Sequence, residues 1–420
     1  MFDLDKWTEI IHVLIKNPLR TSLTALGVFW GIFMLVIMLG AGRGLQNGVE
    51  KGMGHWNKNS LFIWAQRTSK AYQGLSPGRN IRMTNEDYEA LVRNVPSAEV
   101  ITPRNQLGGF SGNNNVVRGN KSATFQVLGD YPEVRKIETI LIEKGRFINQ
   151  NDMLDKRKIC VIGSRVKELL FDKEEEIIGA YIRINGVYFK VAGIFTTKGS
   201  GERALGFTER IYTPFSTFQQ AFNYGNTVSW FTMIAKENES SEDLHQQAIE
   251  ILRSRHKVAP DDKRAFGHFD LSKEFQKIQG LFIGINALSW FVGALTLIAG
   301  VIGVSNIMLV LVKERTKEIG IRRALGAKPI NIVSQIVWES LTLTSLAGYM
   351  GLFFGVATLG LMDVLIQQAN SDEMMFANPQ VDLSIALYAL AILVFSGALA
   401  GLIPARRALK ISPVDALRAE

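Results

Sequence analysis

Four long stretches of the chain contain no charged side chain, and a polar region separates the first from the others. They are Thr21 to Gly42, Leu281 to Val312, Ser340 to Met362 and Leu383 to Ala405. Each reaches or exceeds the ~20 residues that a helix needs to cross the hydrocarbon core of a bilayer. The pattern therefore predicts four transmembrane helices and, between the first two, one large water-exposed domain.

A cleaved secretory signal and a water-soluble helical core both fit this pattern less well. The apolar core of a secretory signal is about 7 to 15 residues long, shorter than the first stretch. Four buried core helices in a water-soluble protein would need a larger apolar interior than 420 residues can assemble. We therefore expect an α+β membrane protein with a mixed α/β domain outside the membrane.

The first 17 residues have a different pattern. Leu4, Trp7, Ile11 and Leu14 recur at helical spacing among charged residues, which predicts an amphipathic helix lying along the membrane surface and contacting lipid. Pro18 ends that helix, because proline has no backbone N–H and disfavours helical geometry in the residue before it.

The large polar region alternates between strand-like and helix-like segments. "SLFIWAQ", "TNEDYEALVRNV" and "AEVITPR" read as strand, helix and strand, and "VSWFTMIA", "SSEDLHQQAIEILRSRH" and "RAFGHFD" repeat that order downstream. Between them, "KICVIG", "SRVKELLF" and "AYIRINGVYFKVAGIF" indicate a strand-rich insert with a hairpin at Asn185-Gly186. The Gly- and Asn-rich "GGFSGNNNVVRGN" is expected to be a mobile loop.

The second apolar stretch is longer than a bilayer crossing requires. With no proline and with apolar residues at helical spacing from Phe275 onward, its helix is expected to extend outward as a stalk. Small residues four positions apart occur in every span, and such pairs let helices approach closely in lipid. The pairs are Gly27 and Gly31, Ser289 and Gly293, Gly351 and Gly355, and Gly397 and Gly401. Glycine is common in membrane helices in any case, but a pair in each span favours a packed bundle, extended by dimerisation.

The charges indicate how the helices are oriented. Short connections rich in Lys and Arg stay in the cytoplasm. Such residues flank the spans at Lys6, Lys16 and Arg20, at Lys313, Arg315, Lys317, Arg322, Arg323 and Lys328, and at Arg406, Arg407, Lys410 and Arg418. The connection from Asp363 to Asp382 has acidic residues and no basic one. Both termini are therefore expected in the cytoplasm and the large domain outside it. The formal charge of +8 reflects this topology, not a nucleic-acid-binding face.

These patterns predict the following order of segments. We expect transmembrane helices at 18–43, 280–312, 330–362 and 383–405. On the cytoplasmic side we expect an amphipathic helix at 1–17, a charged segment at 313–329 and a tail at 406–420. On the external side we expect a short loop at 363–382 and a domain at 44–279, which has an α/β part in halves near 58–105 and 227–272 and an insert near 106–226.

Motifs for catalysis or cofactor binding are missing from the sequence. It has no nucleotide-binding G-x-x-x-x-G-K-[ST] loop and no H-E-x-x-H, G-x-S-x-G or C-x-x-C motif, and its five histidines lack ligand spacing. The single cysteine, Cys160, is expected to behave as a small apolar residue. The middles of the spans lack the ionisable groups of ion-coupled carriers. We therefore expect no enzyme activity, metal or cofactor in this chain.

The charged segment "VKERTKEIGIRRALGAKP" lies between the second and third spans. From Glu314 to Leu325 it can form a helix with Glu314–Lys317, Arg315–Glu318 and Glu318–Arg322 pairs, ended by Gly326 and Pro329. Either it is a solvated connector whose charges enforce topology, or it is a docking helix for a cytoplasmic partner.

Three parts of the sequence resemble one known family. "VKERTKEIGIRRALGAKPINI", "GLIPARRALKISPVDALRAE" and "IKNPLRTSLTALGVFWGI" are similar to the permease part of macrolide-exporter-type ABC transporters, the MacB/FtsX-like family. "EKGRFINQNDMLDKRKICVIGSRVKELLF", "GAYIRINGVYFKVAGIF" and "IYTPFSTFQQAF" resemble its periplasmic domain. The resemblance implies the bacterial inner membrane, a split porter-like subdomain with an inserted sabre-like one, and a working dimer, either of one chain or with a related permease.

The resemblance also implies a role for the charged segment. In this family the corresponding helix is a coupling helix seated on an ATPase. Carried over, the contact would be made by Glu314, Arg315, Lys317, Glu318, Ile319, Gly320, Arg322, Arg323 and Leu325. No nucleotide-binding domain is fused here, so a separate ABC ATPase subunit is expected to use ATP and Mg. An adaptor and an outer-membrane duct are implied for efflux. The alternatives are an FtsX-like lever that activates cell-wall hydrolases or signals, and a LolC/LolE-like lipoprotein-releasing permease.

Overall fold

The computed structural model describes residues 18–53, 56–109, 112–172, 174–198, 202–368, 376–379 and 383–409. The amphipathic helix predicted at 1–17 lies outside these residues, as does the tail from residue 410. The chain divides into two units. One comprises residues 1–49 with 280–420, and the other residues 50–279.

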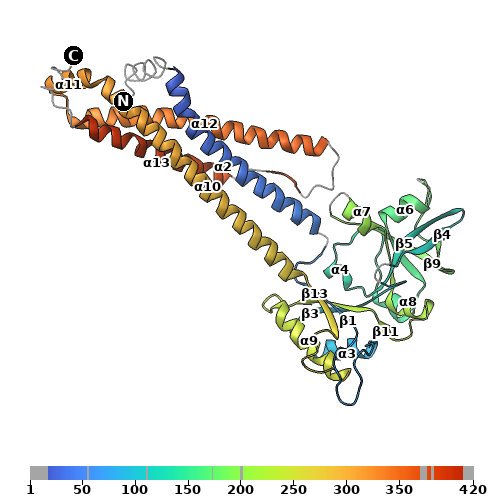
Figure 1. The fold of residues 1–420 in the computed structure, drawn as a ribbon. Helices are drawn as coiled ribbons and strands as arrows, with labels where there is room; N and C mark the ends of the chain where they lie inside the picture. Colours follow the sequence, from blue (N-terminus) through green and yellow to red (C-terminus); the bar gives the residue numbers. More distant parts are fainter. Residues whose placement is uncertain are drawn as a thin grey trace. The chain divides into compact units, whose positions relative to one another are not determined.

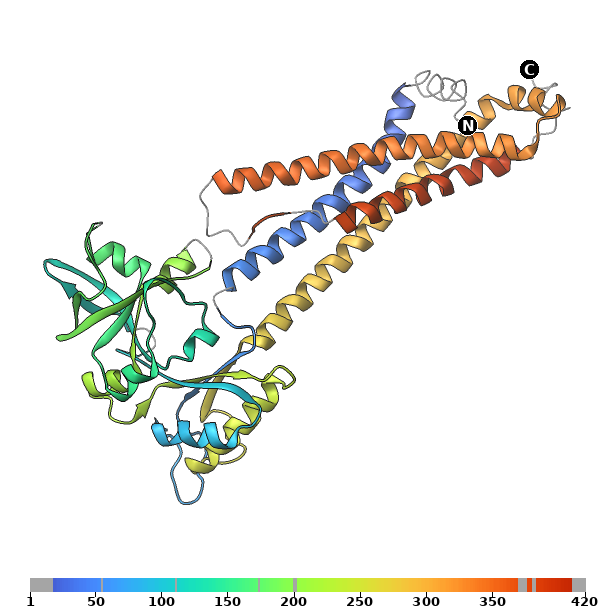
Figure 2. The ribbon, with the colours of Figure 1, turned by 180° about the vertical axis from the view of Figure 1, so that it is seen from behind.

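The first unit is built from long helices (Figures 1 and 2). Four helices among the described residues are long and apolar enough to cross a membrane. They are α2 (Pro18–Met53), α10 (Leu271–Glu314), α12 (Pro329–Gln368) and α13 (Leu383–Ala408). These correspond to the four predicted spans. The shorter α11 (Thr316–Ala324) connects α10 to α12.

All four long helices extend past the bounds predicted for their spans, α13 by three residues to Ala408. α2 continues to Met53, α12 continues to Gln368, and α10 begins at Leu271. α10 begins there because a carboxylate oxygen of Asp270 accepts hydrogen bonds from the backbone N–H groups of Ser272 and Lys273, at 3.0 and 3.3 Å. The second span thus continues as helix on its N-terminal side, and this continuation starts four residues before Phe275.

Glycines allow the helices of this unit to lie close together. A Cβ on Gly27 of α2 would be 3.4 Å from the Cα of Gly300 on α10, and a Cβ on Gly351 of α12 would be 2.5 Å from the carbonyl oxygen of Phe29 on α2. Other predicted packing residues lie at further contacts: Gly31 at Leu297, Gly293 at Leu35, Gly355 at Val36, Gly397 at Thr344 and Gly401 at Ser340 and Val337. Ser289 is buried. A Cβ would come within 3.0 Å of a neighbouring atom at Gly293, Gly351, Gly355 and Gly397, whereas at Gly27 and Gly31 it would make a contact of 3.3 to 3.4 Å.

We predict that Gly351→Ala destabilises the protein, by about 1–3 kcal/mol, since its Cβ would collide with the backbone of α2. Gly360 on the same helix is the matched control, because a Cβ there meets nothing within 4 Å. Gly360→Ala should be neutral or stabilising by up to about 1 kcal/mol, since alanine favours helix. Thermal unfolding of the full chain in detergent measures both. Equal effects would contradict the assigned contact.

The second unit contains an 11-stranded sheet with helices against it (Figures 1 and 2). One part of the sheet has the order β3-β12-β1-β13, with each strand antiparallel to its neighbours. Its elements are β1 (Ser60–Ala65), α3 (Asn85–Asn94), β3 (Ala98–Gln106), β12 (Trp230–Ala235), α9 (Ser241–Arg255) and β13 (Phe266–Asp270). This is a βαββαβ arrangement in which the insert joins β3 to β12.

The strands of the insert close into a ring in the order β10-β7-β9-β8-β4-β5, because β5 also pairs with β10. They are β4 (Asn114–Arg118), β5 (Lys121–Asp130), β7 (Ile159–Gly163), β8 (Tyr181–Ile184), β9 (Val187–Thr196) and β10 (Arg210–Pro214), with β6 (Leu141–Gly145) added on β9. The short helices are α4 (Val134–Ile137), α5 (Gln150–Leu154), α6 (Ser164–Leu170), α7 (Glu202–Thr208) and α8 (Phe215–Ala221). The pair β2 (Met83–Thr84) and β11 (Thr227–Val228) forms a separate small sheet.

The strands and helices quoted from the sequence are confirmed, with one exception. The β8–β9 hairpin turns at Asn185 and Gly186, whose φ angles of 42° and 89° suit a tight hairpin turn. The predicted loop "GGFSGNNNVVRGN" is wrong in part, because Asn114–Arg118 is strand β4. Its Val116 is fully buried, and pairing with β5 and β8 overrides the polar composition. Cys160 is buried in the core of the insert, and burial raises the pKa of its thiol.

A buried cluster of charges links the insert to the βαββαβ part. Arg104 of β3 is 3% exposed, and its Nε and Nη1 lie 2.8 and 2.7 Å from carboxylate oxygens of Asp130 and Glu138. Arg210 and Tyr212 of β10 also contact Glu138, at 3.3 and 2.6 Å. Burial opposes ionisation of both acids, but the two guanidinium groups lower the pKa of Glu138. At Asp130 burial outweighs the attraction of Arg104 and raises the pKa to about 6.

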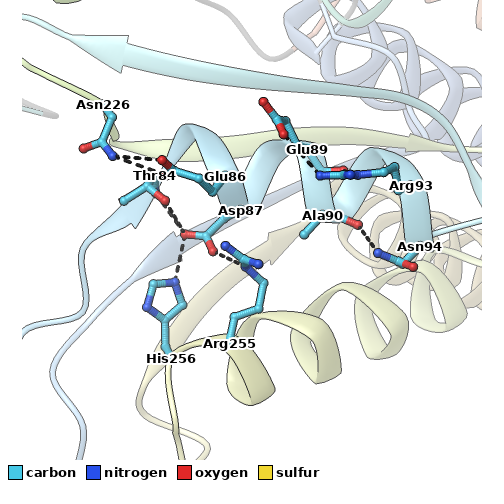
Figure 3. Close-up of polar contacts among 10 residues, drawn as sticks. All are labelled: Thr84, Glu86, Asp87, Glu89, Ala90, Arg93, Asn94, Asn226, Arg255 and His256. Carbon is cyan, nitrogen blue, oxygen red and sulfur yellow. Dashed lines mark hydrogen bonds and ion pairs between the residues drawn. The ribbon is translucent and has the colours of Figure 1, made fainter.

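A second buried carboxylate joins the two helices of the βαββαβ part (Figure 3). Asp87, in the first turn of α3, is 1% exposed. One of its oxygens lies 2.6 Å from Nε of Arg255, and the other lies 2.8 Å from Nε2 of His256, at the C-terminal end of α9. Burial raises the pKa of Asp87, but the hydrogen bonds from His256 and Arg255 outweigh it and lower the pKa to about 2.

We predict that Asp87→Asn destabilises the protein at neutral pH by roughly 2 kcal/mol. Because the folded-state pKa is depressed, this stabilisation is complete above pH 4 and disappears as the pH falls through about 2. The difference in melting temperature between wild type and variant should therefore shrink between pH 5 and pH 2. Glu89→Gln, which removes an exposed carboxylate on the same helix, should change little. A difference that is independent of pH would contradict the assignment.

Candidate coupling site

The charged segment forms a short helix between two long ones. α10 ends at Glu314, Arg315 precedes α11, and α11 ends at Ala324. Gly326 then adopts φ +91°, a conformation that glycine enters without steric cost. The N–H groups of Gly326 and Ala327 donate to the carbonyls of Arg323 and Arg322, at 3.1 and 3.0 Å, which closes the helix end. The glycine stop is confirmed, but the helix is shorter than predicted, because it begins at Thr316 and Glu314 belongs to the end of α10.

One face of α11 packs against α10 and α12 of the same unit. Ile319 is 8% exposed and belongs to an apolar cluster that includes Val312 of α10 and Ile332 and Ile336 of α12. Gly320 is buried beside it. Ile319 and Gly320, both predicted to contact an ATPase, therefore lie inside the chain and are not on its outer surface.

The N-terminal end of α11 is held by an ion pair. Nη1 of Arg315 lies 3.0 Å from a carboxylate oxygen of Glu339 on α12, whose side chain is 5% exposed. Gln335, one turn earlier on α12, points its amide toward the same oxygen at 3.5 Å. A buried carboxylate is tolerated when a cation and further polar groups surround it.

Two more arginines fasten the rest of α11. Arg322 lies 2.7 Å from Glu318 on its own helix and donates to Gln335 of α12 at 2.9 Å. Arg323 donates to the carbonyl oxygen of Leu409, just after α13, at 2.9 Å. α11 is thus bonded to α12 and to the end of α13.

The predicted pairs within the segment hold in part. Glu318–Arg322 is confirmed, but Arg315 bonds to Glu339 and not to Glu318. The reason is tertiary: the turn at Arg315 directs its side chain toward α12. The role of Glu339 as the partner was missed, although its place at the start of an otherwise uncharged span is visible in the sequence.

The outer face of the segment combines charge with apolar side chains. Leu325 is 84% exposed, Ile330 66% and Ile321 43%. Lys313, Glu314, Lys317, Glu318 and Lys328 are exposed or partly exposed on the same segment. Exposed isoleucine and leucine next to charged groups are typical of surfaces that another protein covers. Among the described residues, no group of three His, Cys, Asp or Glu side chains is arranged to hold a metal ion.

Two family models match different parts of the chain. The MacB-like periplasmic core domain matches residues 21–251, and the FtsX-like permease C-terminal domain matches residues 290–413. The chain belongs to the MacB/FtsX-like family of ABC transporter permeases. The family resemblance of the sequence is thereby confirmed, as is the fold class of four apolar helices with a large α/β domain. The four apolar helices and the match to the permease domain together indicate that the chain is a multi-pass membrane protein.

Several proteins are similar to this chain along almost all of its length. The pyoverdine export ATP-binding/permease protein PvdT of Pseudomonas entomophila is 29% identical over 96% of this chain and 58% of its own length. The macrolide export ATP-binding/permease protein MacB of Bdellovibrio bacteriovorus is 28% identical over 97% of this chain and 61% of its own. The chain thus spans about three fifths of these curated relatives. A crystal structure of the periplasmic region of MacB from Actinobacillus actinomycetemcomitans is 19% identical, with a TM-score of 0.43, and covers 56% of this chain and 98% of that one.

We predict that Arg315 and Glu339 are energetically coupled. In a double-mutant cycle with Arg315→Ala and Glu339→Ala, the losses of stability in the two single variants should add up to more than the loss in the double variant. The coupling energy should be about 1–3 kcal/mol, because each single variant leaves a partly buried charge unpaired. Hydrogen exchange of the α11 amides should rise in both single variants. Strict additivity would contradict the pair.

Proposed function

We propose that this chain is the permease of an ABC transporter and that the segment 313–329 receives movement from an ATPase. The observation that carries the proposal is the two-sided construction of α11. Its inner side is fastened by Arg315, Ile319 and Arg323, and its outer side exposes Ile321 and Leu325 among charges. A helix fixed on one side and available on the other can pass on a force applied to it.

The proposal divides the predicted ATPase-contact residues into two groups. Glu314, Lys317, Glu318 and Leu325 form the docking surface, to which the proposal adds the exposed Ile321, a residue outside the predicted set. Arg315, Ile319, Gly320, Arg322 and Arg323 hold the helix in place and act on the partner indirectly. Leu325, at 84% exposure, is the side chain of this surface that a docked partner would bury most.

The long helices supply a route for the movement. α10 is one uninterrupted helix of 44 residues from Leu271 to Glu314. Its length of about 66 Å exceeds the ~30 Å hydrocarbon core. It follows β13 directly, so its two ends belong to the coupling segment and to the α/β unit. We propose that nucleotide turnover by a cytoplasmic ATPase moves α11 and α12, and that α10 conveys this to the α/β unit.

We further propose that this work drives export. The relatives are named for pyoverdine and macrolide export, which favours an efflux role in a bacterial inner membrane with the α/β unit on the outer side. ATP and Mg would be bound by the ATPase, and cargo would pass to an adaptor and an outer-membrane duct. An apolar groove of about 910 Å³ in the first unit, lined by side chains including Trp290, Ile298, Phe395 and Ile403, supports pairing with a second permease chain.

We predict that Ile321→Glu with Leu325→Glu reduces association with the ATPase at least about tenfold, because two charges replace the apolar contacts. Membrane insertion and melting temperature should stay unchanged, since both side chains are exposed. The control is Leu154→Glu, which changes a 70% exposed leucine in the other unit. Co-purification of the partner ATPase and permease-stimulated ATP hydrolysis are the measurements. Wild-type association in the double variant would refute the proposed docking surface.

A further inference from the structure

Strand β13 forms an edge of the sheet of the second unit that the described strands leave open. β13 is the last strand in the order β3-β12-β1-β13, and among the described strands it pairs with β1 alone. Native proteins protect such edges with lysine, proline or bulges, because unpaired N–H and C=O groups invite another strand. Residues 266–270, "FGHFD", contain neither lysine nor proline, and their register with β1 is regular.

The register shows which backbone groups face outward. The N–H of Gln66 donates to the carbonyl of Ala265 at 2.8 Å, so these two residues form a hydrogen-bonded pair. In an antiparallel ladder such pairs alternate. Gly267 and Phe269 therefore bond to β1, and the N–H and C=O groups of Phe266 and His268 point away from it. His268 and Phe269 are both exposed, as expected at an edge.

A groove runs between this edge strand and helix α9. It has a volume of about 830 Å³, within the range of ligand-binding pockets. Phe266 and His268 line it from β13, Gln246 and Ile249 line it from α9, and Val258 lines it from the segment between them. Ile249, Val258 and Phe266 are 3–5% exposed and form an apolar floor.

The histidine that α9 contributes to the groove is uncharged. The rings of His245 and His268 lie 3.9 Å apart between their centroids. Burial, together with the nearby His268, lowers the pKa of His245 to about 4, so its ring is neutral at physiological pH. The lining also includes two acidic and two basic side chains, Glu242, Glu250, Arg253 and Lys263. An apolar floor with charges of both signs around it suits an extended peptide better than a small molecule of a single charge.

We propose that the edge of β13 and the groove beside α9 bind an extended peptide segment of a partner protein, which adds to the sheet as a further strand. Its backbone pairs with the outward groups of Phe266 and His268. Its alternate side chains are apolar and enter the groove over Ile249 and Val258. Main-chain hydrogen bonds supply affinity and the groove supplies selectivity, as in other cases of strand addition. This site is separate from the coupling segment and does not depend on the function proposed for it.

Two substitutions block the site in different ways. His268→Pro removes an N–H that points outward and leaves the pairing with β1 in place, which proline permits on an edge strand. Gln246→Trp fills the groove from an exposed position of α9. The matched control is His268→Thr, which removes the same imidazole and keeps the N–H. Melting temperatures check that each variant folds. If His268→Pro does not fold, Gln246→Trp and hydrogen exchange decide the outcome.

The experiment selects peptides from a random twelve-residue phage library on the purified full-length chain in detergent. The enriched peptides are then made synthetically, and their affinities are measured by fluorescence anisotropy. We expect apolar residues at alternate positions, binding weakened at least about tenfold by His268→Pro and by Gln246→Trp, and binding within about threefold of wild type for His268→Thr. Bound peptide should protect the amides of Phe266 and His268 from hydrogen exchange.

Three results would overturn the inference. The first is that no peptide is enriched above empty micelles. The second is that the enriched peptides bind both blocking variants as well as they bind the wild type. The third is that the chain self-associates in a manner that His268→Pro abolishes, which would assign the edge to a second copy of this chain.

Discussion

Paired buried charges connect parts of this chain that lie far apart in sequence. Arg104 holds Asp130 and Glu138 where the inserted strands meet the βαββαβ part, Asp87 joins α3 to the end of α9, and Arg315 meets Glu339 beside α11. Each pair is costly to break, because removal of one partner leaves a charge without compensation in a low-dielectric site. The placement of α11 depends on such a pair, and the proposed coupling depends on that placement.

The membrane constrains the rest of the first unit. Backbone groups in the hydrocarbon must be satisfied within each segment, so the spans are helices, and small residues determine how closely they approach. Gly27 and Gly351 lie where the backbones of α10 and α2 come near. A charged side chain is found at the border of this apolar region, at Glu339, where Arg315 compensates it. The same border carries the exposed segment proposed to meet an ATPase.

The α/β unit combines two constructions with different edges. The six strands of the inserted ring close on themselves through the pairing of β5 with β10, and β6 is added outside the ring on β9. The βαββαβ part stays open at β13, beside a groove and directly before α10. An added strand at β13 would therefore lie at the start of α10, the helix proposed to convey movement. Binding of a partner at the inferred peptide site could then act directly on that helix.

Local patterns in the sequence determined the elements. Uncharged stretches predicted α2, α10, α12 and α13, because the thickness of a bilayer sets how many consecutive apolar residues a span needs. Asn185-Gly186 predicted the β8–β9 hairpin and Gly326 predicted the end of α11, because the backbone freedom of glycine acts at its own position in the chain. The tertiary structure decided the partners. It made Asn114–Arg118 a strand by pairing it with β5 and β8, and it directed Arg315, Arg322 and Arg323 toward the chain's own helices. Those outcomes depend on residues brought together from distant positions, which propensity and spacing do not encode.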